Sequence, residues 1–90
     1  MGGEPLCDNN AFLTRLVIQE VRNKIPNTKI YIWTGYTIEQ LKKSQNPHVK
    51  ESLRLANVLI DGPYIEAERD VTLKMRGSRN QRIIDLDKNF

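Results

Sequence analysis

The sequence predicts an α/β fold in which helices alternate with short strands and the strands form a small parallel sheet. Segments with helical periodicity alternate with β-branched or aromatic segments, and short polar turns join them. Val58-Leu59-Ile60 is an apolar run without alternation, which is typical of a strand covered on both faces. We expect one partial domain over residues 1–90, with an α/β core over residues 1–65 and a charged extension over residues 66–90.

The first helix is expected to run for about 15 residues after Asp8-Asn9-Asn10, whose side chains can cap a helix. Apolar residues recur every four positions along it and predict one buried stripe. This stripe comprises Leu13, Val17, Val21 and Ile25. Pro26 and Asn27 end the helix.

A strand over residues 29–34 and two helices are expected next. The strand is β-branched and aromatic, and Gly35 ends it. Thr37 and Gln40 match a capping box at the start of a short helix. Asn46-Pro47 breaks that helix and starts another, in which Val49, Leu53 and Ala56 line one face. Residues 82–86 are expected to form a last strand, and residues 87–90 to be frayed.

Composition excludes several classes of protein. The chain has 90 residues, 39% of them hydrophobic, and a net charge of +3 that does not require a nucleic-acid partner. Cys7 is the single cysteine, so an internal disulfide is excluded and a cytoplasmic location is expected. No apolar run approaches the roughly 18 residues that cross a bilayer, so no membrane association is expected.

Polar groups follow the predicted strands at one edge of the sheet. Thr34 and Gly35 end one strand and Asp61 ends another. Ligands of open α/β sheets bind at that edge. Glu4 joins them if Gly2-Gly3-Glu4-Pro5 also ends a strand. A carboxylate, a hydroxyl and glycine backbone groups can together hold a zwitterion. The alternative interpretation is that all of these are ordinary turn residues.

The basic segment over residues 76–82 has two interpretations. Its guanidinium groups can bind phosphate or the carboxylates of a partner. Alternatively it is a solvated loop in which Asn80 and Gln81 make local hydrogen bonds. Aromatic residues do not interleave with its arginines, so nucleic-acid binding is only weakly supported.

Four motifs, taken in order, resemble one known family. They are Gly2-Gly3-Glu4-Pro5-Leu6, Trp33-Thr34-Gly35-Tyr36, Ile60-Asp61-Gly62-Pro63 and Arg76-Gly77-Ser78-Arg79-Asn80-Gln81-Arg82. Together they resemble the C-terminal portion of anaerobic ribonucleoside-triphosphate reductase activating proteins, which are radical S-adenosylmethionine enzymes.

The resemblance implies a partial parallel (β/α) barrel that binds S-adenosylmethionine through a [4Fe-4S] cluster. A Cys-x3-Cys-x2-Cys motif holds that cluster, and the resulting 5′-deoxyadenosyl radical takes a hydrogen atom from a glycine of the large reductase subunit, the expected partner. Gly2, Gly3, Glu4 and Pro5 match the motif that holds the methionine amino group. Thr34, Gly35 and Asp61 match positions where related enzymes contact the cofactor. Docking to the reductase is the hypothesis for Arg76, Ser78, Asn80 and Gln81.

The chain departs from this family in its cysteines. The cysteine motif belongs before Gly-Gly-Glu-Pro, whereas Cys7 follows it. We therefore expect a fragment that is inactive alone, has no catalytic or metal-binding residue of its own, and lacks the first strands of the barrel. Its uncovered sheet edge predicts self-association. The alternatives are a non-catalytic module that docks to the reductase and, less favoured, a small basic module that binds nucleic acid.

Overall fold

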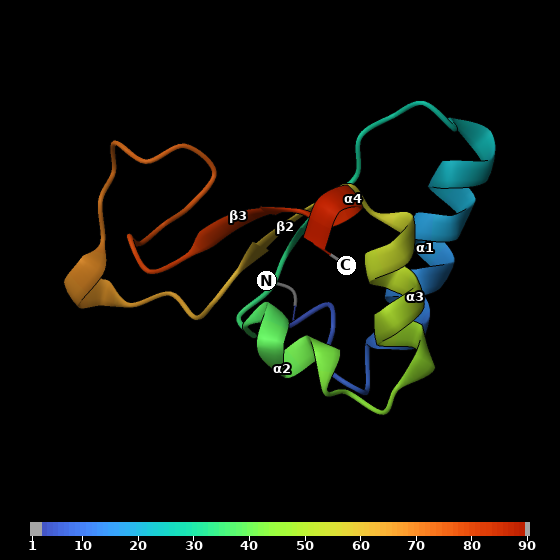
Figure 1. The fold of residues 1–90 in the computed structure, drawn as a ribbon, viewed down its shortest axis with the longest axis horizontal. Coiled ribbons are helices and arrows are strands. Elements are labelled where there is room, and N and C mark those ends of the chain that lie inside the picture. Colours follow the sequence, from blue (N-terminus) through green and yellow to red (C-terminus); the bar gives the residue numbers. More distant parts are fainter. Residues whose placement is uncertain (1–2, 90) are drawn as a thin grey trace.

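The computed structural model describes residues 3–89, and helices and strands alternate along most of that length as expected (Figure 1). The elements are α1 (Ala11–Lys24), β1 (Tyr31–Trp33), α2 (Ile38–Lys42), α3 (Pro47–Leu55), β2 (Val58–Asp61), a 3₁₀ turn (Glu66–Glu68), β3 (Arg82–Asp85) and α4 (Leu86–Asn89). The α/β class is confirmed.

Within residues 3–89 the sheet has three strands, in the order β1-β2-β3. β1 and β2 are parallel, with Ile32 opposite Leu59, but β3 runs antiparallel to β2, with Ile60 opposite Ile83. The prediction of a parallel sheet was therefore wrong for β3. A parallel connection needs a long crossover, usually helical, whereas residues 62–81 leave β2 and return beside it with only a 3₁₀ turn between them.

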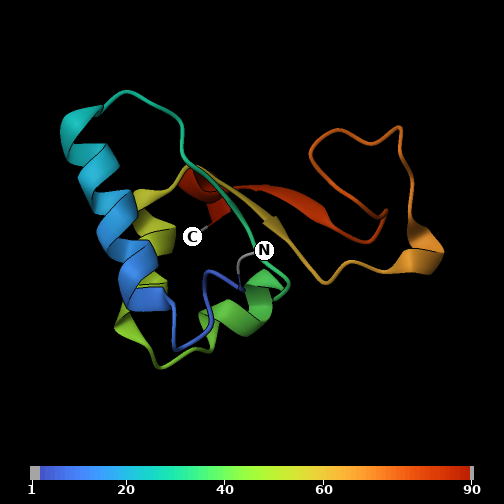
Figure 2. The ribbon, with the colours of Figure 1, turned by 180° about the vertical axis from the view of Figure 1, so that it is seen from behind.

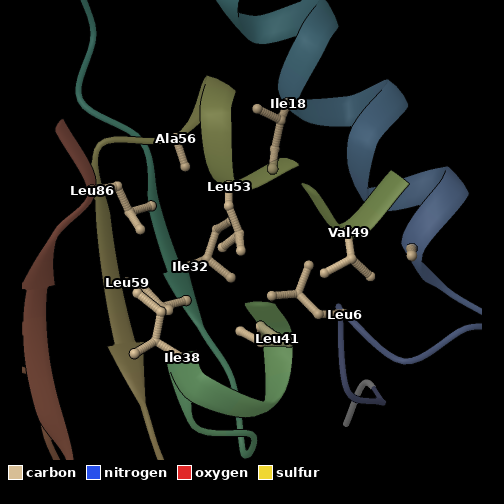
Figure 3. Close-up of a cluster of buried hydrophobic side chains, with 11 residues drawn as sticks. Leu6, Ile18, Ile32, Ile38, Leu41, Val49, Leu53, Ala56, Leu59 and Leu86 are labelled. Carbon is tan, nitrogen blue, oxygen red and sulfur yellow. The ribbon is translucent and has the colours of Figure 1, made fainter. Parts of the chain in front are cut away.

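All four helices contribute to a core on one face of the sheet (Figure 3). Ile32 and Leu59 point from the strands toward Leu53 of α3, which is completely buried. The remaining labelled side chains close around this centre: Leu6, Ile18, Ile38, Leu41, Val49, Ala56 and Leu86. The predicted inner face of α3 is thus confirmed.

The predicted buried stripe of α1 was wrong. The side chains of Leu13 and Val17 are 63% and 55% exposed, and the buried residues of α1 are Ala11 and Ile18. α1 packs mainly on α3, and this contact uses a different side of the helix from the stripe. Asn10 precedes α1 but makes no capping bond through its side chain, which donates to the Glu4 carbonyl instead.

The caps of α2 and α3 are confirmed. Gln40 N donates to Thr37 Oγ1 at 3.2 Å, and Thr37 N donates to Gln40 Oε1 at 2.8 Å. Asn46 Oδ1 accepts from His48 N at 2.9 Å, and Pro47 begins α3. These caps fix where α2 and α3 start, and the start of α2 adjoins the end of β1.

Residues 62–81 form a long excursion that projects away from the helices (Figures 1 and 2). The chain then re-enters the domain, because β3 joins the sheet and Leu86 lies in the core. The expected last strand ends one residue early, at Asp85, and Leu86 instead begins α4. α4 continues over residues 87–89, where fraying was expected. A boundary at residue 65 remains a prediction, although β3 and Leu86 lie beyond it.

Candidate functional site

The Glu4 carboxylate joins the N-terminal segment to the end of β1. Its Oε2 accepts hydrogen bonds from Thr34 Oγ1 at 2.5 Å and from Leu6 N at 3.0 Å. Its Oε1 accepts one from Gly35 N at 2.7 Å. The sequence placed Glu4 at this strand end only if its own segment also ended a strand. Residues 3–5 are not in a strand, yet the Glu4 carboxylate reaches the end of β1. The hydroxyl and glycine amide therefore hold a carboxylate of the chain itself.

This half-buried carboxylate retains capacity to bind a ligand. A carboxylate has about four acceptor positions. Among the described residues, three hydrogen bonds reach the Glu4 carboxylate, two on Oε2 and one on Oε1. One acceptor position on Oε1 is left, and it suits the ammonium group of a zwitterion.

A pocket with a volume of about 380 Å³ lies beside Glu4. This volume is within the range that is usual for small-molecule sites. It is lined by Gly3, Glu4, Pro5, Trp33, Thr34, Gly35, Gly62, Tyr64 and Gln81. Residues from all four sequence motifs thus meet at one place. Gly2, predicted as part of this site, lies outside the described residues. Tyr64 was missed, although its position directly after Gly62-Pro63 at a strand end was a usable signal.

Asp61 lies behind the pocket and not in its wall. Its side chain is fully buried, and Arg82 donates to both carboxylate oxygens, from Nε at 3.0 Å and Nη2 at 2.6 Å. Ile38 N at the start of α2 also donates to Oδ2, at 2.8 Å. The next residue, Gly62, reaches the pocket with φ +98°, a conformation that favours glycine. Asp61 therefore holds the strand end whose next residue lines the pocket.

Arg82 connects three elements, a role that sequence reasoning missed. Besides Asp61 of β2 it binds Glu39 of α2, with Nη2 to Oε1 at 2.7 Å. The hydrogen bond from Arg82 lowers the pKa of Glu39 from 4.5 to about 2. Asp61, and after it Glu39, raise the pKa of Arg82. The guanidinium therefore ties β3 to both β2 and α2.

Gln81 closes the base of the excursion. Its Oε1 accepts from Gly77 N at 2.8 Å and from Ser78 N at 3.2 Å. Its Nε2 donates to Gly62 O at 3.0 Å. Arg76 Nη1 in turn donates to the Gln81 carbonyl at 3.0 Å. One side chain thereby fixes both ends of the loop.

Ser78 and Asn80 complete this closure. Ser78 Oγ donates to Asn80 Oδ1 at 2.6 Å and accepts from Ile65 N at 3.2 Å. Asn80 Nδ2 donates to Pro63 O at 2.8 Å. The structure therefore contains the local hydrogen bonds that one interpretation of the segment assigned to Asn80 and Gln81. Trp33 Nε1 also donates to Met75 O at 2.7 Å, so the loop is held to β1 as well.

Metal ligands are scarce in the described part of the chain. Cys7 is half-buried and lines a different hollow, with Leu6, Tyr36 and Gln40 among its neighbours. Within residues 3–89, no group of three or more His, Cys, Asp or Glu side chains is placed to hold a metal ion. None of the helices in that range is long and apolar enough to cross a membrane.

Comparison with known proteins gives consistent matches. The family described as "4Fe-4S single cluster domain" matches residues 1–84. Proteins named anaerobic ribonucleoside-triphosphate reductase-activating protein are 38% identical over 82 residues in Haemophilus influenzae and 37% over 82 residues in Vibrio cholerae. The Escherichia coli K12 protein of that name is 35% identical over 80 residues.

The matches cover 89–91% of this chain and 49–50% of those three relatives. The chain therefore spans about half the length of the curated relatives it matches. No solved structure gives a significant match.

Proposed function

The chain belongs to the 4Fe-4S single cluster domain family, and on that premise we propose that it is part of an activating protein for anaerobic ribonucleoside-triphosphate reductase. Support comes from the relatives of that name, which match along about nine-tenths of this chain. The proposed partner is the large reductase subunit, on which the complete protein forms a glycyl radical, and the proposed location is the cytoplasm. The proposed fold of the complete protein is a partial (β/α) barrel.

The observation that carries the proposal is the Glu4 carboxylate at the pocket wall. We propose that its remaining acceptor position binds the ammonium group of S-adenosylmethionine, with Gly3 and Pro5 in the same pocket wall. Gly2, which lies outside the described residues, is kept in the proposed motif from the sequence alone. Thr34 and Gly35 orient this carboxylate through hydrogen bonds of 2.5 and 2.7 Å. Bound there, the cofactor would supply the radical chemistry. Asp61 does not contact the cofactor in this proposal. It fixes the end of β2, and so the position of Gly62 in the pocket wall.

The residues present do not fit the cluster. Cysteine thiolates hold [4Fe-4S] clusters, and this sequence has only Cys7. Cys7 faces a different hollow from the Glu4 pocket. We therefore assign no cluster ligand to this chain and propose that it is inactive alone.

The excursion has a proposed role in docking to the reductase. Arg76, Ser78, Asn80 and Gln81 hold the loop in one shape through their mutual hydrogen bonds. The loop projects from the domain (Figure 2). It carries exposed apolar side chains, including those of Val71 and Met75. A partner would thus meet a loop that is already ordered, which lowers the entropic cost of association.

Calorimetric titration of the chain with S-adenosylmethionine tests cofactor binding. Glu4→Gln removes the negative charge that an ammonium group needs, so we expect affinity to fall at least about tenfold, or about 1.4 kcal/mol. Glu20→Gln is the control, because Glu20 is an exposed residue of α1 paired only with Lys24 in a surface bridge. Circular dichroism checks that both variants are folded.

Two results would contradict the proposed cofactor site. If the Glu4→Gln variant is folded and its affinity for S-adenosylmethionine is unchanged, Glu4 does not bind the cofactor. A wild-type chain that gives no heat would show that this chain does not bind the cofactor alone, and would leave docking as its function.

A further inference from the structure

Three residues in the wall of the proposed cofactor pocket also contact one short segment of the excursion. Trp33 Nε1 donates to Met75 O at 2.7 Å, and Gln81 Oε1 accepts from Gly77 N at 2.8 Å. The Tyr64 ring lies so close to Gly77 that a Cβ atom added there would be 2.9 Å from Tyr64 Cδ1. These three side chains therefore lie between the pocket and this part of the loop.

The contact between Trp33 and Met75 holds a strained backbone. Within residues 3–89, Met75 is the one residue other than glycine with a positive φ, at +67°. This left-handed conformation costs free energy in a residue that has a side chain, and it persists where neighbouring contacts hold it. The hydrogen bond from the Trp33 indole to the Met75 carbonyl is such a contact. When that bond breaks, Met75 is free to return to a negative φ.

Trp33 and Tyr64 have room to move when no ligand fills the pocket. They are 51% and 50% exposed, and exposed side chains change rotamer within picoseconds to nanoseconds. A ligand that fills the pocket packs against both rings and restricts this motion. The Trp33 indole then stays where it reaches the Met75 carbonyl. A ligand in the pocket therefore favours the conformation of the loop in which this hydrogen bond is made.

We propose that the hydrogen bond between Trp33 and Met75 is a latch that couples the cofactor pocket to the excursion. S-adenosylmethionine in the pocket closes the latch and fixes the segment around Met75, in addition to the closure that Gln81 makes at the base of the loop. The proposal rests on the function proposed above. It makes Trp33 a positioning residue for docking, because the cofactor-bound chain presents this segment to the reductase in one shape. Since coupling between two sites is reciprocal, docking in turn tightens cofactor binding.

Hydrogen exchange with and without S-adenosylmethionine tests the latch. The amides of Asp70 and Leu73 report on the loop, because they donate hydrogen bonds inside it, to Gly77 O and Asp70 O. At a saturating concentration of cofactor, we expect both amides to exchange at least tenfold more slowly than in the free chain. Trp33 is the single tryptophan of the sequence, so its indole hydrogen gives a separate signal. We expect the exchange of this hydrogen with water to slow by the same factor.

Two substitutions at Met75 separate the latch from a general effect of the ligand. Proline fixes φ at about −65°, so Met75→Pro breaks the latch without changing a residue that lines the pocket. Met75→Asn is the matched control, because it also removes the methionine side chain but tolerates the left-handed conformation. We expect the cofactor to slow loop exchange at least tenfold in Met75→Asn and less than twofold in Met75→Pro. A purely structural role of the bond would change the exchange rates but not their dependence on the cofactor.

Calorimetry on the same samples distinguishes failure of the latch from failure of the cofactor site. Cofactor heat that Glu4→Gln abolishes, together with unchanged exchange at Asp70 and Leu73, would overturn the latch alone. Equal slowing in the two Met75 variants would do the same, because the bond would then not transmit the effect. If circular dichroism shows that Met75→Pro is unfolded, the wild-type indole hydrogen decides, and unchanged exchange there overturns the latch. A chain that gives no heat would contradict the cofactor site and the latch together.

Discussion

Buried carboxylates show what single residues do in this chain. Asp61 follows a buried strand, and its position alone suggested a ligand contact. Its two oxygens instead accept from Arg82 and from the amide of Ile38. A fully buried charge is costly unless it is paired and hydrogen-bonded, so this network is what allows Asp61 to remain in the interior. Glu4 differs, because it is half-buried and keeps acceptor capacity at the pocket.

Glu39→Gln tests the outer arm of the Arg82 network. The pKa of Glu39 is lowered from 4.5 to about 2, so its contribution to stability is present above pH 4.5 and is lost as pH falls toward 2. As pH is lowered from 4.5 toward 2, we expect the free energy of unfolding to fall less steeply for the variant than for the wild type. Urea denaturation at several pH values measures it.

The control for this change is Glu51→Gln, at a surface residue paired with Arg54. Equal pH slopes for wild type and Glu39→Gln would show that the ion pair with Arg82 contributes no stability in solution.

Among the elements, α1 and the excursion differ most from their sequence patterns. Repetition every four residues predicts the stripe of α1 but not which elements lie against it, and α3 covers a different side of the helix. For the excursion, one of the two interpretations expected local hydrogen bonds from Asn80 and Gln81, but not that these side chains and Ser78 bond to residues 62–65. Hydrogen bonds between residues 13 to 19 positions apart are not visible as a local pattern.

Gln81→Ala should loosen the excursion without unfolding the domain. The change removes the acceptor for two loop amides and the donor to Gly62. We expect the amides of Gly77 and Ser78 to exchange at least about tenfold faster with solvent, while amides of α3 keep their rates. Hydrogen exchange followed by NMR measures both.

Gln45→Ala, at an exposed residue between α2 and α3, serves as the control for this loop experiment. Uniformly faster exchange in α3 and the loop of Gln81→Ala would mean that the loop closure supports the whole fold, contrary to the expectation.

At the scale of the whole molecule, stability depends on a core built on one face of a three-stranded sheet. Leu53 of α3 is completely buried, and Ile32 and Leu59 point toward it from the sheet (Figure 3). A domain of this size has a small margin of stability, so a single central residue carries a large share of it.

Leu53→Ala should therefore destabilise the chain severely. Removing a buried leucine side chain leaves a cavity and costs about 2–5 kcal/mol. We expect a large loss of helical circular dichroism at 37 °C and a much lower midpoint in urea. Val71→Ala, at an exposed site, should change the free energy of unfolding by less than about 0.5 kcal/mol. A cooperative, native-like transition in Leu53→Ala would contradict the placement of the core.

The sequence alone determined the class of fold, the caps of α2 and α3 and the inner face of α3. These features depend on local hydrogen bonds or on periodicity, both of which are written in consecutive residues. Only the tertiary structure decided the direction of β3, the exposed side of α1, the pairing of Asp61 with Arg82 and the contact of Glu4 with the end of β1. Each of these features depends on which distant segments of the chain come into contact, and a local sequence pattern does not identify the segment that it will contact.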